Sequence, residues 1–537
     1  MKRVFILFLL VTGCLLLATL SNAADKPIKS KIPDTPEARE RGKGIYFKRC
    51  SFCHGLLGDG NGPAAQQMMP MPRDFTTGLY KFRSTETGAL PTDEDLFMTI
   101  SRGIPGTAMQ TFDSDKIKNG LAEEERWQVM YYIKAFSDSF ADKDNDPYQQ
   151  VVKVSNEVKS SPESIAKGEK IFKEMKCWEC HGDRGRGDGP NSAKLADKFK
   201  GDPILPFDLT KGWRYKAGNT PLDIYKRFST GINGTPMPSF VDSLNEEERW
   251  HLANFVVSLQ KREVKNESVL RARYVNGELP SAPDNPAWGK AESIDVQMAG
   301  QVIAKPRWEN PSVDLVTVKS IYNDKEIAFL LEWGDRFKDA VHKPELDYKL
   351  PNEYGGYVKW KDIPQEPGTF TDSIAIQFSV KAADGTKKPH FFRGDSSNPV
   401  NLWVWKADLE EGGKPSVEDV NALGYSQPIR VQPEKDQQAK GKGVWSGGVW
   451  KVVIKRPLTT DGKNDIQFEK SKFIPIALNV WDGSNGEHNL IMSLSSWHYL
   501  FLEESKPLSV YLYAFLGIAI TGIGEFWLLS RSRKDRR

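Results

Sequence analysis

Four of the five cysteines in this 537-residue chain fall in two copies of one short pattern, in which a histidine directly follows the second cysteine of a pair. The copies are Cys50-Ser51-Phe52-Cys53-His54 and Cys177-Trp178-Glu179-Cys180-His181. Two thiols one helical turn apart can reach both vinyl groups of one porphyrin, and the adjacent histidine can then bind the iron from the same side. The pattern therefore predicts two covalently attached c-type haems, held by Cys50, Cys53, Cys177 and Cys180, with His54 and His181 as iron ligands.

Two other structures would use the same thiols. The four cysteines could form a pair of disulfides, or could together bind one zinc ion. Neither structure requires a histidine directly after each second cysteine, so we favour haem attachment.

The sequence around the two motifs is also repeated, which indicates a duplicated domain. Glycine-rich segments follow both motifs, methionine-containing segments come next, and a run with three glutamates ends each copy. These pairs of segments are 58–63 and 185–190, 103–109 and 231–237, and 121–127 and 244–250.

Each copy resembles a class I cytochrome c over roughly a hundred residues. The order is a helix, the Cys-x-x-Cys-His motif, a glycine-rich loop, a methionine loop and a closing helix whose acidic first turn suits the helix dipole. The resemblance implies that His54 and His181 are the proximal iron ligands and Met109 and Met237 the distal ones. A histidine–methionine pair raises the reduction potential of a haem relative to two histidines.

The distal ligand of the first haem has alternatives. Met68, Met69 and Met71 lie in the loop that follows the first glycine-rich segment. We prefer Met109 because it aligns with Met237 and stands at the same place before the closing helix.

Short aromatic and β-branched segments, separated by turn residues, replace helical patterns after residue 264. Examples are 327–333, 373–380, 400–405, 449–454 and 473–480. Strands at this spacing predict an antiparallel β-sandwich.

Several of these segments occur in an order that points to a known family. The segments are 374–378, 399–405, 448–458, 480–487 and 495–497. Residues 285–504 thereby resemble the haem-b-binding γ subunit of the ethylbenzene dehydrogenase, chlorate reductase and nitrite oxidoreductase group of molybdenum enzymes. The resemblance implies one haem b in addition to the two haem c groups.

The residues that hold haem b in that family are not reproduced here. The family's methionine precedes a Gly-Asp pair, where this chain has Arg393, and the family's lysine corresponds to Met492. Met492 and His390 are therefore the candidate ligands of a haem b iron, and the alternatives are a different mode of binding or loss of this haem.

Both ends of the chain carry export or membrane signals. Lys2 and Arg3 precede an apolar run over 4–20 and small residues over 21–24, the layout of a secretory signal peptide. A lipoprotein site at Cys14 and an N-terminal anchor are the alternatives. The apolar segment 508–529, followed by basic residues, predicts a transmembrane helix with a cytoplasmic C-terminus.

These features predict two all-α class I cytochrome c domains, an all-β antiparallel sandwich and one C-terminal transmembrane helix. The expected boundaries are 1–23 for the signal peptide, 24–145 and 160–262 for the cytochrome c domains, 285–504 for the sandwich and 508–529 for the transmembrane helix. We expect the exported protein on the periplasmic face of the cytoplasmic membrane.

We expect an electron-transfer subunit of a periplasmic molybdenum oxidoreductase, most like a nitrite oxidoreductase or nitrate reductase γ subunit. Its expected partners are a molybdopterin catalytic subunit, an iron–sulfur subunit, respiratory electron-transfer proteins and the membrane. The sequence has no recognisable nucleophile–base motif and no nucleotide-binding loop, so we expect no catalytic residues. A net charge of only +3 gives no reason to expect nucleic-acid binding.

Two other functions compete with this one. A free-standing dihaem cytochrome c would carry electrons between respiratory complexes. A dihaem peroxidase would need an open distal site at one iron, and two well-placed methionines argue against it.

Overall fold

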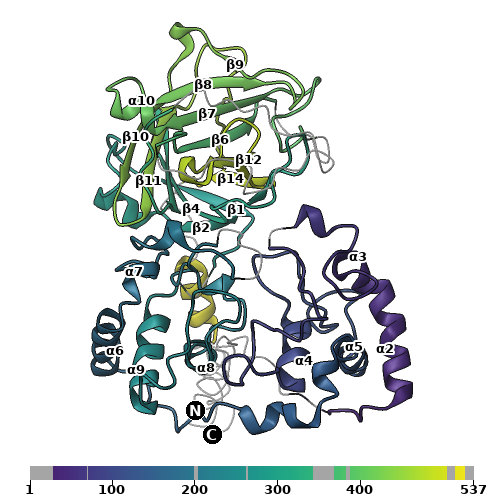
Figure 1. Cartoon of the computed structure of the whole chain (residues 1–537). Helices are drawn as coiled ribbons and strands as arrows, with labels where there is room; N and C mark the ends of the chain where they lie inside the picture. Colours follow the sequence, from purple (N-terminus) through teal and green to yellow (C-terminus); the bar gives the residue numbers. More distant parts are fainter. Residues whose placement is uncertain are drawn as a thin grey trace, which may run out of the picture.

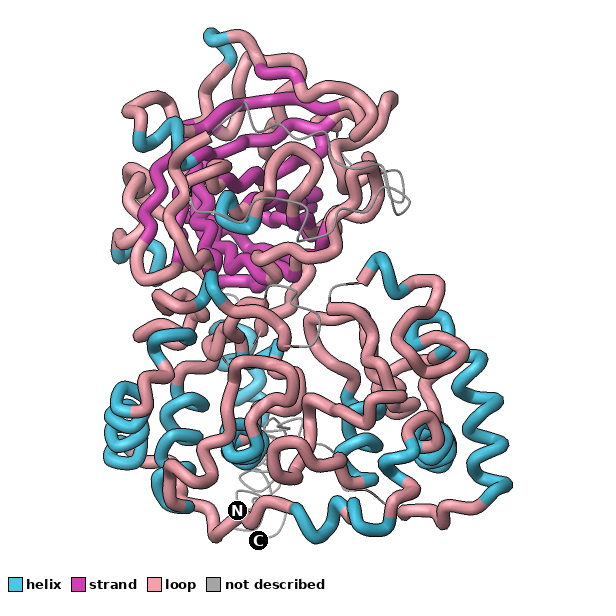
Figure 2. Tube along the Cα trace, viewed as in Figure 1, coloured by secondary structure: helices cyan, strands magenta, loops and turns pink. Residues whose placement is uncertain are grey.

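The computed structural model describes two helical domains and a β-sandwich. The described residues are 28, 30–68, 70–198, 204–261, 264–342, 368–381, 388–504 and 515–525. The two helical domains lie side by side, and the sandwich sits over the second of them (Figure 1). The strands are confined to the sandwich, whereas helices and long loops make up the two domains below it (Figure 2).

Side-chain caps begin α2 and α4 in the first helical domain and α6, α8 and α9 in the second. In the first domain, Thr35 accepts a hydrogen bond from the Ala38 amide, and Pro36 occupies the first helical position, where it loses no hydrogen bond. The first domain contains α2 (Pro36–Arg49), α3 (Ser51–His54), α4 (Asp93–Arg102) and α5 (Glu123–Lys134). The second contains α6 (Pro162–Glu174), α7 (Trp178–His181), α8 (Pro221–Thr230) and α9 (Glu246–Ser258).

A glycine permits the first and last long helices of each domain to cross closely. A Cβ on Gly42 of α2 would lie 2.0 Å from the Gln128 carbonyl oxygen of α5. A Cβ on Gly168 of α6 would lie 2.1 Å from the His251 carbonyl oxygen of α9. The repeat in the sequence is therefore also a repeat in helix packing.

The sandwich consists of two sheets joined through one strand. β1 pairs in parallel with β14 of one sheet over its first residues and with β4 of the other sheet over its last. The remaining named pairs are antiparallel, and β1 lies ahead of residue 285, where the sequence predicts the sandwich to begin. The order of the main path is β10-β11-β5-β4-β1-β14-β12-β6-β7-β8-β9.

The bounds of the sandwich elements are as follows. The strands are β1 (Val269–Tyr274), β2 (Ser293–Gln297), β3 (Ala299–Gly300), β4 (Leu315–Tyr322), β5 (Glu326–Gly334), β6 (Ser373–Ser379), β7 (Val400–Lys406), β8 (Val417–Ala422), β9 (Arg430–Val431), β10 (Lys440–Trp445), β11 (Val449–Pro457), β12 (Phe473–Trp481), β13 (Ser493–Leu494) and β14 (His498–Leu502). A short helix, α10 (Ala407–Glu411), follows β7.

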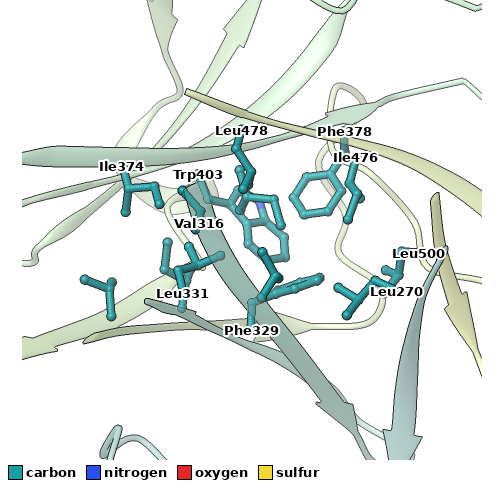
Figure 3. Close-up of a cluster of buried hydrophobic side chains, with 14 of the residues drawn as sticks. Leu270, Val316, Phe329, Leu331, Ile374, Phe378, Trp403, Ile476, Leu478 and Leu500 are labelled. Carbon is teal, nitrogen blue, oxygen red and sulfur yellow. The ribbon is translucent and has the colours of Figure 1, made fainter. Parts of the chain in front are cut away.

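The inner faces of the two sheets bury one large apolar core. Phe329 of β5 in one sheet contacts Trp403 of β7 and Phe378 of β6 in the other, with ring centroids 5.9 and 5.8 Å apart (Figure 3). All three side chains are fully buried. Burying such large apolar surfaces is the main force that holds the two sheets together.

The prediction of a transmembrane helix is wrong within the described residues. Within the described residues, no helix is long and apolar enough to cross a membrane. Residues 515–525, the described part of the predicted span, are helical. The rest of 508–529, the predicted signal peptide and Cys14 lie outside the described residues.

Candidate functional site

Both Cys-x-x-Cys-His motifs form one short helical turn directly after the first long helix of their domain. The backbone amides of His54 and His181 donate to the carbonyl oxygens of Cys50 and Cys177, each over 2.9 Å. One turn of helix therefore brings both thiols of a motif to the same side, as attachment to a single porphyrin requires. The structure thus forms the same local geometry twice.

The four thiols of the motifs are all free in the described part of the chain. No group of described residues that could hold a metal ion includes a cysteine, so the disulfide and zinc alternatives find no support. Burial raises the pKa of Cys50 to about 12 and that of Cys177 to about 11. Both are consequently thiols at neutral pH, the form that adds across a vinyl group.

The imidazoles of His54 and His181 are held in the same way. Nδ1 of His54 lies 3.0 Å from the Arg73 carbonyl oxygen, and Nδ1 of His181 lies 3.0 Å from the Phe207 carbonyl oxygen. A carbonyl oxygen only accepts, so Nδ1 carries the proton and Nε2 keeps its lone pair for a metal. Burial lowers the pKa of both histidines, which favours this neutral form.

The two methionine loops also share one geometry. The amides of Ile104 and Ile232 donate to the carbonyl oxygens of Met109 and Met237, over 2.8 and 3.2 Å. The Met237 side chain packs against the apolar core of the second domain, and Met109 is half-buried. Among the alternatives, Met68 and Met71 are half-buried, and Met69 lies outside the described residues.

Three buried donors of the two helical domains lack an acceptor among the described residues. Tyr80 Oη, one terminal nitrogen of Arg83 and Nε of Arg227 are buried with no hydrogen-bond partner. Burial lowers the pKa of both arginines to about 10, so they remain cations. Haem carries two propionate carboxylates, which are the anionic acceptors that such donors lack. The sequence motifs gave no signal for these three residues, because they lie outside the repeated segments.

The contact between the two helical domains involves both methionine loops. Arg214 of the second domain donates to the Gly106 carbonyl oxygen in the first loop, over 3.2 Å. Asn233 in the second loop donates to the Tyr80 carbonyl oxygen over 3.2 Å and accepts from the Gly88 amide over 3.3 Å. The methionine sides of the two candidate haem pockets therefore face a common interface.

Asp314 joins the second helical domain to the sandwich. It accepts hydrogen bonds from Lys211 Nζ over 2.7 Å and from Trp213 Nε1 over 3.0 Å, and lies 3.2 Å from a terminal nitrogen of Arg214. Burial tends to raise the pKa of Asp314, but the positive charges of Lys211 and Arg214 and these hydrogen bonds hold it below its usual value. The Phe207 carbonyl oxygen holds His181, and the segment that follows Phe207 leads directly into this contact.

The loop after the second haem motif also meets the sandwich. A Cβ on Gly447 would overlap a terminal nitrogen of Arg184, and a Cβ on Gly448 would lie 2.4 Å from Cδ of Arg186. Both glycines have positive φ angles and stand in the turn between β10 and β11. The loop after the second haem motif therefore contacts the sandwich.

The corresponding loop of the first domain is exposed and apolar. Phe52, Leu56 and Leu57 are 65%, 67% and 73% exposed, and they lie within or directly after the haem motif. The equivalent positions of the second domain are Glu179, Asp183 and Arg184. The two copies thus have the same backbone but different surfaces at the haem-attachment end.

The candidate ligands for haem b do not form a matched pair. Met492 is fully buried in a cluster with Ala304, Phe392 and Leu494, which suits a thioether bound to a buried iron. His390 is exposed, and its Nδ1 accepts from the Phe392 amide over 3.1 Å. Met492 therefore fits the role of a haem b ligand and His390 does not, so we derive no electron-transfer step through haem b.

Comparison with known families agrees with this arrangement. The cytochrome c family matches residues 39–137 and again residues 165–260. The ethylbenzene dehydrogenase family matches residues 285–426 within the sandwich.

Three known proteins have sequences similar to that of this chain. The putative respiratory nitrate reductase heme subunit ORF7 of Haloferax mediterranei is 26% identical over 50% of this chain and 84% of its own length. The dimethylsulfide dehydrogenase subunit gamma of Rhodovulum sulfidophilum is 24% identical over 41% of this chain and 74% of its own. The chlorate reductase subunit gamma of Ideonella dechloratans is 29% identical over 41% of this chain and 79% of its own.

The families and relatives confirm the predicted combination of domains and the presence of haem c. The chain is a haem-carrying electron-transfer protein in which two cytochrome c domains are joined to a γ-subunit-type domain of the ethylbenzene dehydrogenase family.

Proposed function

We propose that this chain is the electron-transfer subunit of an exported molybdenum oxidoreductase, most like a nitrite oxidoreductase or nitrate reductase. In this role it relays electrons between an iron–sulfur subunit and a respiratory partner, while a molybdopterin subunit performs the chemistry. The names of the relatives support the proposal, since they are a nitrate reductase heme subunit and gamma subunits of dimethylsulfide dehydrogenase and chlorate reductase.

We assign the haem-binding roles to the residues that the two domains hold in equivalent places. Cys50 and Cys53 attach the first haem, and Cys177 and Cys180 attach the second. His54 with Met109, and His181 with Met237, are the axial ligands. Each haem, when bound, supplies a one-electron change at its iron. The neutral imidazoles, each held from Nδ1 by a backbone carbonyl oxygen, support this assignment.

The position of the second cytochrome c domain is the observation that carries the proposal. It contacts the sandwich through Asp314 and contacts the first domain through both methionine loops. The second domain thus stands between the sandwich and the first domain, which supports a relay through the two cytochrome c domains.

The exposed apolar loop of the first domain is the place where we expect electrons to leave or enter the chain. Phe52, Leu56 and Leu57 adjoin the haem-attachment residues, so a partner docked on them comes close to the first haem. Apolar patches of this kind are typical of protein contact sites.

Purification of the native complex tests the proposal. We expect the full chain to purify with molybdenum and with iron in excess of the two haem c irons, both measured by elemental analysis. Peptide mass spectrometry should identify a molybdopterin subunit and an iron–sulfur subunit in the same fractions.

A free-standing cytochrome would behave differently. It would elute alone, with two iron atoms per chain and no molybdenum, and this result would overturn the proposal. A pyridine haemochrome spectrum of the same sample reports haem b separately, because b-type and c-type haems absorb at different wavelengths. A spectrum with haem c alone would show that the protein carries no haem b. It would leave the proposed relay through the two cytochrome c domains unchanged.

A further inference from the structure

Three buried carboxylates meet at one end of the sandwich. Asp335 directly follows β5, Asp372 directly precedes β6, and Asp482 directly follows β12. One oxygen from each lies within 4.8 Å of the other two, and all three residues are at most 3% exposed. We call these residues the carboxylate cluster. Because β5 belongs to one sheet and β6 and β12 to the other, the carboxylate cluster joins the two sheets.

The hydrogen bonds that the carboxylate cluster accepts from described residues come from neutral donors. Asp372 accepts from the Gly483 amide over 2.9 Å and from Trp450 Nε1 over 2.9 Å. The ion pairs among the described residues include none of the three aspartates. Burial and mutual repulsion hold the pKa of Asp335 and Asp372 well above the usual value.

A second group of buried carboxylates in the same sandwich is paired with an arginine, which is a common way to compensate buried charge. The side chains of Asp419 and Asp465 are also buried, but each has a carboxylate oxygen 3.7 Å from a terminal nitrogen of the equally buried Arg456. Buried charges are normally paired in this way or bound to a metal. Among the described residues, no arginine forms such a pair with the carboxylate cluster.

A fourth carboxylate beside the cluster has an oxygen without a partner. Asp339 is 1% exposed, and its backbone amide donates to Oδ2 of Asp372 over 2.7 Å. Oδ1 of Asp339 accepts from the Gly368 amide, but Oδ2 is buried with no hydrogen-bond partner. The Asp339 side chain also lies against Gly483, next to Asp482, because a Cβ on Gly483 would be 2.9 Å from its Cβ. This buried carboxylate oxygen of Asp339 therefore has no positively charged partner among the described residues.

We propose that the carboxylate cluster, together with Asp339, binds one Ca²⁺ ion that ties the two sheets of the sandwich together. Oxygen ligands alone indicate a hard cation. Calcium binds oxygen at about 2.3–2.6 Å, so carboxylate oxygens that all lie within 4.8 Å of one another can share one ion. Magnesium usually keeps several waters and is bound through only one or two carboxylates, so a site made of several buried carboxylates favours calcium.

Elemental analysis of the full haem-loaded protein tests this proposal without any variant. The protein is purified with CaCl₂ present throughout and then desalted into metal-free buffer. We expect one calcium per two haem irons, so that iron serves as the internal standard. A calcium content below a tenth of this ratio would overturn the proposal and would leave three protonated carboxyls as the explanation of the cluster.

Thermal unfolding gives a second readout on the same protein. We expect EGTA to lower the unfolding midpoint of the sandwich by about 5 °C or more, and added CaCl₂, but not MgCl₂, to restore it. Midpoints that do not respond to EGTA, in protein that retains no calcium, would contradict the proposal.

Matched variants locate the ion. Asp482→Asn should reduce the calcium-to-iron ratio at least tenfold, because it removes one charged ligand. Asp419→Asn, at the carboxylate paired with Arg456, should leave the ratio unchanged. Full calcium in Asp482→Asn would show that the ion is bound elsewhere in the chain.

Discussion

The imidazole of His54 donates from Nδ1 to the Arg73 carbonyl oxygen, and His181 makes the same hydrogen bond to Phe207. The carbonyl lies 19 residues after the histidine in the first copy and 26 after it in the second. The haem motif therefore identifies the histidine, but the loop that orients it varies in length. At the scale of single residues, the motif provides the iron ligand, and a carbonyl oxygen in the loop determines which nitrogen of the imidazole carries the proton.

Replacement of the methionines tests the distal assignment. Met237→Ala should remove about half of the near-infrared sulfur-to-iron absorption of the oxidised protein, because only one of two irons loses its thioether. Met109→Ala should remove the other half. The reduction potential of the affected haem should also fall, since methionine ligation raises it.

Met68→Ala is the matched control, because Met68 is an alternative ligand in the loop after the first haem motif. Its near-infrared absorption should equal that of the wild type. If Met68→Ala loses the band and Met109→Ala keeps it, then the assignment of Met109 is incorrect.

Each cytochrome c domain is held together where its first and last long helices cross. Gly42 at the crossing of α2 and α5 corresponds to Gly168 at the crossing of α6 and α9. The crossing positions the haem motif, because the short motif helix follows closely on the first long helix. α3 begins two residues after the end of α2, and α7 begins four residues after the end of α6. The packing of these elements therefore determines where the thiols lie.

Alanine substitutions in α2 measure the close approach of the helices. Gly42→Ala should weaken the packing of α2 by about 1–3 kcal/mol, because its Cβ would overlap the Gln128 carbonyl oxygen. Hydrogen–deuterium exchange of α2 peptides should accelerate by roughly 5- to 150-fold. Gly44→Ala in the same helix has open space around its Cβ and should stabilise α2 by about 0.5–1 kcal/mol. Equal exchange in both variants would contradict this account.

The whole molecule places the second cytochrome c domain between two neighbours. The loop after its haem motif contacts the sandwich, whereas the corresponding loop of the first domain is exposed and apolar. Duplication followed by different surface residues has therefore given one domain an internal contact and the other a free surface.

The contact at Asp314 should depend on pH. The pKa of this carboxyl is held below its usual value in the folded chain, so its contribution to stability is present above about pH 4 and is lost as the pH falls through the folded pKa. At neutral pH, Asp314→Asn should cost about 2 kcal/mol, the range for hydrogen bonds to charged groups. The difference in unfolding midpoint between wild type and variant should shrink between pH 5 and pH 2.

Asp242→Asn serves as the control for that titration, because Asp242 is an exposed carboxylate of the same domain. Its midpoint should follow the wild type across the whole pH range. A constant difference between wild type and Asp314→Asn down to pH 2 would refute the role of the ionised carboxylate.

The apolar loop of the first domain should control exchange with protein partners. The double variant Leu56→Glu, Leu57→Glu should slow electron transfer to a soluble class I cytochrome c about tenfold or more, because burial of each leucine contributes about 1.5–3 kcal/mol. Reaction with ferricyanide, which needs no large docking surface, should change much less. Tyr425→Glu, at an exposed aromatic residue of the sandwich, should leave the protein reaction unchanged.

Much of this organisation could be predicted from the sequence, because it depends on short spacings. The distance between Cys50 and Cys53 reflects one turn of helix, and the alignment of Met109 with Met237 reflects duplication. The sandwich could be predicted because alternating apolar residues and turn residues are local signals. The predicted transmembrane helix was wrong, since no helix among the described residues is long and apolar enough to cross a membrane.

By itself, the sequence determined the presence of haem c, the duplicated domain and the family of the sandwich, and it predicted the residues that hold each haem. Only the tertiary structure decided which haem loop contacts the sandwich, how Asp314 joins two domains, and that Asp335, Asp372 and Asp482 meet. The physical reason is separation along the chain. Hydrogen bonds within one helical turn follow from residue spacing, whereas contacts between residues tens to hundreds of positions apart depend on how whole elements pack.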